Sequence, residues 1–229
     1  MRIALLVVIL LLIVFGPQIW TKRVFARYAT PRDDYPGTGG ELARHLLDQF
    51  DMKHVKVEQT DTFPGDHYDP QTKTVRLTPD KLNGKSLTAV TVAAHEVGHA
   101  IQDYTGYQPL VERTRLVRLA QGAEKVGAVM MLGVPIAVGL TRAPAAGVLV
   151  LVAGVLTMGI ATLVHLVTLP VEWDASFRRA LPVLEKGQYL SHGDMTGARK
   201  ILTAAALTYV AASLASLLNL WRWIALLRR

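Results

Sequence analysis

Four long apolar segments alternate with one polar stretch along this chain. Residues 3–20 are almost wholly aliphatic, and uncharged stretches recur at 126–141, 143–171 and 201–221. A helix needs about 20 predominantly apolar residues to cross a bilayer. We therefore expect about four transmembrane helices, the second of which must take an extra turn from the residues before it. A cleaved signal peptide is the alternative for the first segment, but this apolar run is longer than usual and lacks a small-x-small cleavage site.

The polar stretch at residues 23–125 contains most of the acids and turn residues, which predicts one small domain inserted between the first two spans. Leucines at helical spacing predict a helix over 38–50, and alternating residues predict strands at 55–59 and 74–78. The link at 66–70 has the composition of a turn. Ser86 is a suitable N-cap for a helix that follows it.

The sequence His-Glu-x-x-His lies on that helix. His95 and His99 are four residues apart, so both imidazoles project from one helix face and can bind one zinc ion. Glu96 is placed to act as general base on a water molecule. A chance pattern is the alternative, but the flanking residues are small or apolar, and unused histidines and acids are costly in a buried helix. Gly98 costs helix stability, which indicates that another segment passes close to the metal.

A catalytic zinc usually has three protein ligands, and the chain has no cysteine, so the third ligand is a histidine or an acid. If the second and third spans form a hairpin, the first acid on the returning chain is Glu172, which we predict as the third ligand. Asp174 is then a candidate for orienting a ligating histidine. The alternative is that both acids end a helix in water. Competing acids are Asp103, Glu112 and Glu124.

The motif HEVGHAIQ, preceded by DHYDP and TVRLT and followed by LPVEWDAS, resembles the bacterial YugP-like family of membrane zinc metallopeptidases. This resemblance covers nearly the whole chain. It implies a zincin-type peptidase with its metal motif at His95, Glu96 and His99 and its acidic motif at Glu172. The fold class it implies is an α-helical membrane protein with a small inserted α+β zincin-like domain. The expected organisation is an anchor at 1–22, the zincin-like domain at 23–125, a transmembrane hairpin at 126–171, a ligand-bearing loop or helix at 172–200, and a last transmembrane helix with a basic tail at 201–229.

The chemistry that follows is zinc-assisted peptide hydrolysis, with Glu96 moving the proton. One zinc ion per chain is expected, although manganese, cobalt or iron would also suit the donor atoms. The oxyanion that forms during hydrolysis needs a further donor. Arg179 could instead form an ion pair with Asp174. The candidates for the oxyanion donor are His67, Tyr68, Tyr104, Arg178, Arg179 and His192.

The net charge of +7 does not point to nucleic acid, because the basic residues cluster beside the apolar segments, where anionic lipid headgroups account for them. Expected partners are a peptide or membrane-protein substrate, the lipid bilayer, and a partner protein or second copy of the chain. The expected location is the cell membrane, multi-pass, with the catalytic side in the cytoplasm by the count of basic residues. A zinc-stabilised membrane adaptor without proteolytic activity is the alternative function.

Overall fold

The computed structural model of the chain describes residues 2–62, 65–123, 160 and 162–227. The contacts divide the chain into two compact units. The first unit comprises Met1–Tyr107 and Pro170–Thr208, and the second comprises Gln108–Leu169 and Tyr209–Arg229. The domain boundaries expected from the sequence stay a prediction.

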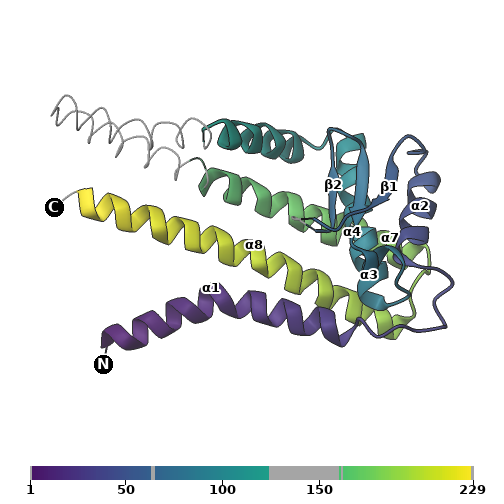
Figure 1. The fold of residues 1–229 in the computed structure, drawn as a ribbon, viewed down its shortest axis with the longest axis horizontal. Helices are drawn as coiled ribbons and strands as arrows, with labels where there is room; N and C mark the ends of the chain where they lie inside the picture. The colour runs from purple at the N-terminus through teal and green to yellow at the C-terminus, as the bar shows by residue number, and fades with distance from the viewer. Residues whose placement is uncertain (1, 63–64, 124–159, 161, 228–229) are drawn as a thin grey trace. The chain divides into compact units, whose positions relative to one another are not determined.

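Helices make up most of the described chain (Figure 1). Residues 108–123 and 162–173 are helical as well, and the π-helix η1 continues directly from the second of these. The C-terminal part of the longest helix, from Tyr209 onward, belongs to the second unit. The helices are α1 (Arg2–Arg27), α2 (Gly39–Gln49), α3 (Pro79–Leu82), α4 (Leu87–Tyr104), η1 (Asp174–Ala180), α7 (Leu181–Lys186) and α8 (His192–Leu227).

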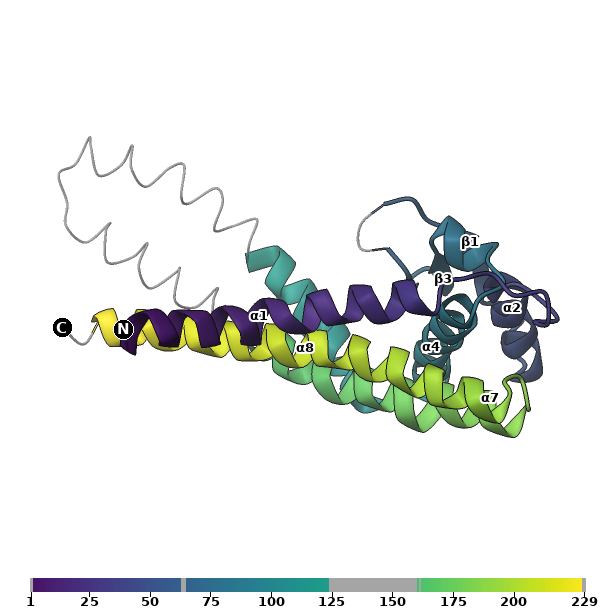
Figure 2. The ribbon, with the colours of Figure 1, turned by 90° about the horizontal axis from the view of Figure 1, so that it is seen from below.

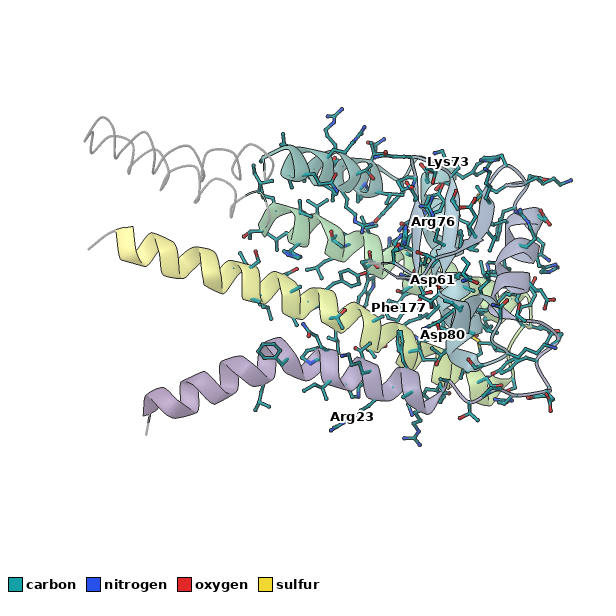
Figure 3. The ribbon with its side chains drawn as sticks, in the orientation of Figure 1. Arg23, Asp61, Lys73, Arg76, Asp80 and Phe177 are labelled. Atoms are coloured by element: carbon teal, nitrogen blue, oxygen red, sulfur yellow. The ribbon has the colours of Figure 1, made fainter. Side chains whose placement is uncertain are left out.

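A three-stranded sheet lies beside α4 and is formed by β1 (Lys56–Gln59), β2 (His67–Asp69) and β3 (Thr74–Leu77). The central strand β3 runs parallel to β1 and antiparallel to β2. Arg76 of β3, labelled in Figure 3, donates to Asp69 of β2 at 3.0 Å. The prediction of a turn-like link at 66–70 was wrong, because ladder hydrogen bonds to β3 outweigh the turn-forming composition of this segment.

The expected helix over 38–50 is α2, and its first turn is closed by a capping box between Thr38 and Glu41. The expected cap of the motif-bearing helix is also confirmed, because the Ser86 hydroxyl accepts a hydrogen bond from the Ala89 backbone N–H at 3.1 Å. Both caps satisfy backbone donors that a helix N-terminus leaves without partners. They fix where α2 and α4 begin.

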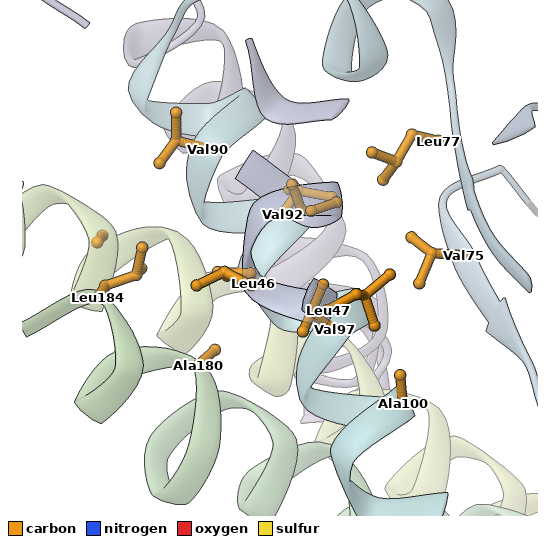
Figure 4. Close-up of a cluster of buried hydrophobic side chains, with 14 of the residues drawn as sticks. Leu46, Leu47, Val75, Leu77, Val90, Val92, Val97, Ala100, Ala180 and Leu184 are labelled. Carbon is orange, nitrogen blue, oxygen red and sulfur yellow. The ribbon is translucent and has the colours of Figure 1, made fainter. Parts of the chain in front are cut away.

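The core of the first unit surrounds α4, with α2 and the sheet gathered about it (Figure 2). Leu46 and Leu47 of α2 are fully buried, as are Val75 and Leu77 of β3, and Val97 of α4 is 1% exposed. Figure 4 shows these side chains together at the centre of the unit. Because the motif-bearing helix is the centre of the core, packing holds its polar side chains in place.

The expectation of about four membrane helices is wrong for the described residues, where one helix, His192–Leu217 within α8, is long and apolar enough to cross a membrane. The fourth expected segment, 201–221, lies in α8 and overlaps this candidate span. The second expected segment and most of the third lie outside the described residues. The first lies in α1, where Val24 and Phe25 pack against the protein core and Thr21 donates to the Ala204 carbonyl at 2.7 Å.

Candidate metal centre

The two histidines of the motif lie on one face of α4. Their rings are 4.7 Å apart between centroids, and both side chains are largely buried, at 13% and 7% exposed for His95 and His99. Glu96, between them in sequence, is 6% exposed. A buried helix that carries three polar side chains over five residues needs a partner for each of them.

Glu172 is the partner of the two histidines and comes from the helical segment that precedes η1. It lies two residues before η1 and is 2% exposed. Its Oε2 atom is 3.2 Å from His95 Nε2 and 3.4 Å from His99 Nε2. Burial by itself raises the pKa of Glu172, but the charges and hydrogen bonds of His99 and His95 outweigh it and hold the pKa well below its ordinary value. Glu172 is thus a carboxylate at neutral pH, the form that binds a metal.

The geometry of these three side chains fits a zinc ion. One donor atom from each of His95, His99 and Glu172 lies within 4.8 Å of the other two. Two donors bound tetrahedrally to zinc at about 2.0–2.1 Å lie roughly 3.3–3.4 Å from each other, which matches the two nitrogen–oxygen distances. Direct ion pairs between these groups are usually shorter, at about 2.7–2.9 Å. These three side chains could therefore hold one metal ion.

The outer nitrogen of each histidine ring is also occupied. Ser176 Oγ lies 3.1 Å from His95 Nδ1, and Gln102 Oε1 lies 2.9 Å from His99 Nδ1. Ser176 and Gln102 are 1% and 0% exposed. A hydrogen bond at Nδ1 leaves the lone pair of Nε2 for a metal. Both imidazoles are thus oriented with their Nε2 atoms toward Glu172.

Gly98 shows why α4 and η1 can approach so closely. A Cβ atom at this position would lie 2.8 Å from the backbone oxygen of Ala175 in η1, nearer than real Cβ contacts occur. The segment η1 therefore passes directly against α4 at Gly98. Because Ala175 is three residues after Glu172, this close packing places the carboxylate over the two histidines.

We expect Gly98→Ala to lower the stability of the metal-free protein by about 1–3 kcal/mol, because the added methyl group forces α4 and η1 apart. Zinc affinity should fall as well, since Glu172 moves with η1. The matched control is Gly122→Ala, where an added Cβ meets nothing within 4 Å. Thermal unfolding and zinc titration of both variants test this. Wild-type stability and zinc affinity in Gly98→Ala would show that the contact does not position the site.

Asp174 does not contact a histidine directly. Its Oδ2 atom accepts hydrogen bonds from Gln102 Nε2 at 2.9 Å and from Arg179 Nε at 2.6 Å. Of the competing acids, Asp103 accepts from Tyr68 and Lys73, and Glu112 is exposed on residues 108–123. Glu124 lies outside the described residues.

The oxyanion candidates lie in other settings. His67 Nδ1 is 2.7 Å from the Gly65 carbonyl oxygen, and Tyr104 is 61% exposed at the last residue of α4. Arg178 is exposed and lines a cavity of about 440 Å³ with residues of α2 and α7. His192 is exposed at the first residue of α8. Their role as oxyanion donors stays a prediction.

Sequence reasoning did not single out Gln102 and Ser176. Gln102 follows His99 by three residues on a helix, a spacing that brings side chains together, so this contact carried a readable signal. Ser176 had no such signal, because its contact with His95 spans 81 positions along the chain.

Comparison with known proteins agrees with the geometry. Residues 3–228 match the family described as "Putative neutral zinc metallopeptidase". The chain is 36% identical over 211 residues to "Putative membrane protease YugP" of Bacillus subtilis (strain 168). The aligned region covers 92% of this chain and 89% of that protein. No solved structure matches the chain. With a family match over nearly its whole length, this chain belongs to the neutral zinc metallopeptidase family.

Proposed function

We propose that this protein is a zinc metallopeptidase that hydrolyses peptide bonds, with one zinc ion per chain held by His95, His99 and Glu172. The observation that carries the proposal is the convergence of these three donors within 4.8 Å of one another, with both nitrogen–oxygen distances suited to ligands of one zinc ion. Glu96, buried on the same helix and adjacent to His95, is the proposed general base.

The proposed roles of the residues follow from their chemistry. Zinc, when bound, polarises the scissile carbonyl and acidifies a water molecule. Glu96 accepts a proton from that water as its oxygen adds to the carbonyl carbon. Glu96 then gives the proton to the departing amine nitrogen as the carbon–nitrogen bond breaks. Ser176 and Gln102 keep the two imidazoles oriented throughout.

The number of ligands favours an enzyme over an adaptor. Within the described residues the metal-binding group has three side chains, whereas structural zinc sites are usually closed by four. Three ligands leave room for water and substrate. A buried acid beside the first histidine is also expected of a hydrolase, since a structural site needs no base.

A membrane location is part of the proposal. The stretch His192–Leu217 of α8 is long and apolar enough to cross a bilayer, and a relative carries the name of a membrane protease. We propose that the substrates are peptides or membrane proteins cut near the bilayer. The cytoplasmic orientation, the partner protein and the oligomeric state stay predictions from the sequence.

Peptide cleavage by purified protein in detergent tests the function. A mixture of unmodified peptides is incubated with the protein, and new termini are identified by mass spectrometry. We expect new termini with the wild-type protein and none after zinc is removed by a chelator. Zinc-loaded protein that produces no termini from any peptide would support the adaptor instead.

A further inference from the structure

A continuous series of hydrogen bonds leads from the metal-binding face of α4 to the surface. His99 Nδ1 meets Gln102 Oε1 at 2.9 Å, and Gln102 Nε2 donates to Asp174 Oδ2 at 2.9 Å. The same Gln102 nitrogen donates to the Val171 carbonyl at 2.8 Å. Arg179 Nε completes the series with a hydrogen bond of 2.6 Å to Asp174. Each hydrogen bond in the series pairs a donor with an acceptor.

The acceptors around Gln102 determine which way its amide faces. Asp174 Oδ2 and the Val171 carbonyl can only accept, so the amide NH2 group must point to them. The amide oxygen is then left facing His99 Nδ1, which must carry the hydrogen. The lone pair of His99 is thereby fixed on Nε2, the nitrogen that faces Glu172. In this way the surroundings of Gln102 select both the tautomer and the ring orientation of His99.

The outer end of the series joins the end of α4, which carries both histidines, to η1, which begins two residues after Glu172. Arg179 Nη1 donates to the Thr105 hydroxyl at 3.2 Å, immediately after α4 ends, and its guanidinium lies 5.5 Å from the centroid of the Tyr107 ring. Asp174 and Arg179 are five residues apart within η1, so one turn of a π-helix brings them together. Asp174 is buried at 6% exposed, and Arg179 balances its charge.

We propose that Gln102 is a positioning residue that holds His99 in its metal-binding tautomer and orientation, supported by Asp174 and Arg179. Many zinc sites place a carboxylate directly on the outer nitrogen of a ligating histidine. Here a neutral amide stands between the histidine and the carboxylate, so His99 is oriented without a full negative charge against its ring. The proposal rests on the zinc site of the proposed function and not on peptide cleavage.

The test compares zinc affinity of wild type, Gln102→Leu and Asp174→Asn, measured by competition with a chromogenic chelator. We expect Gln102→Leu to bind zinc about 10- to 100-fold more weakly, the usual effect of removing an outer partner of a ligand. Asp174→Asn should bind zinc more weakly than wild type but lose less than Gln102→Leu, because its amide oxygen still accepts from Gln102 but no longer balances the charge of Arg179. The visible spectrum of the Co²⁺-substituted proteins gives a second readout, and we expect its bands to shift in Gln102→Leu because His99 is no longer held.

The matched control is Gln71→Leu, the same change at an exposed turn residue, which should keep wild-type zinc affinity. Gln102→Leu with zinc affinity within twofold of wild type and an unchanged Co²⁺ spectrum would overturn the proposal. If Gln102→Leu does not fold, Asp174→Asn decides the matter. Weaker zinc binding with an unchanged melting temperature of the metal-free form supports the proposal, and wild-type binding contradicts it. Peptide cleavage is measured separately. If Gln102→Leu loses zinc and the wild-type protein cleaves no peptide, the role of Gln102 stands and only the proposed peptidase function is overturned.

Discussion

Glu96→Gln is expected to lower the rate of peptide hydrolysis by about 10²–10⁴-fold while the protein keeps its zinc. The amide is nearly the same size as the carboxylate but cannot accept a proton from water. Glu96 is buried on α4 beside His95, so no bulk base replaces it readily. The measurement is the turnover number on a fluorogenic peptide, with zinc content determined on the same sample by atomic emission.

Glu185→Gln is the matched control, since Glu185 is exposed on α7 and should be neutral in both assays. Loss of zinc in Glu96→Gln would mean that Glu96 helps to hold the metal. Retained zinc together with retained turnover would remove Glu96 from the mechanism.

Glu172→Ala is expected to abolish zinc binding at micromolar zinc. The substitution removes one of three ligands and leaves two imidazoles four residues apart on a helix. Because a ligand that binds only the folded state raises its stability by mass action, wild-type protein should melt at a higher temperature when zinc is added. This zinc-dependent increase in melting temperature should vanish in Glu172→Ala.

Glu112→Ala makes the same chemical change at an exposed acid that competed for the ligand role on sequence grounds. It should keep the full zinc-dependent increase in melting temperature. The reverse result, with zinc binding lost in Glu112→Ala and kept in Glu172→Ala, would assign the third ligand to the other acid.

The local features of the first unit could be predicted from the sequence because they depend on neighbours along the chain. The cap at Ser86 and the capping box at Thr38 are set by residues three positions apart. The helical face that carries His95 and His99 follows from a spacing of four. Gly98 indicated a close neighbour, since a glycine in a buried helix needs a reason.

Features that depend on tertiary packing could not be predicted in this way. The π-helix that aligns Asp174 with Arg179 has no distinct sequence pattern, and the contact of Ser176 with His95 joins residues 81 apart. The three-residue strand β2 has the composition of a turn and exists because β3 lies beside it. The number of membrane helices was also not predicted, since the described residues hold one helix that is long and apolar enough to cross a membrane.

Titration of metal-free protein with zinc, followed by peptide cleavage, tests the central claim most directly. We predict that activity rises linearly with added zinc and reaches a plateau at one zinc ion per chain, with no rise in Glu172→Ala. A protein that binds one zinc ion at His95, His99 and Glu172 yet cleaves no peptide, or one that cleaves equally well without zinc, would contradict the account.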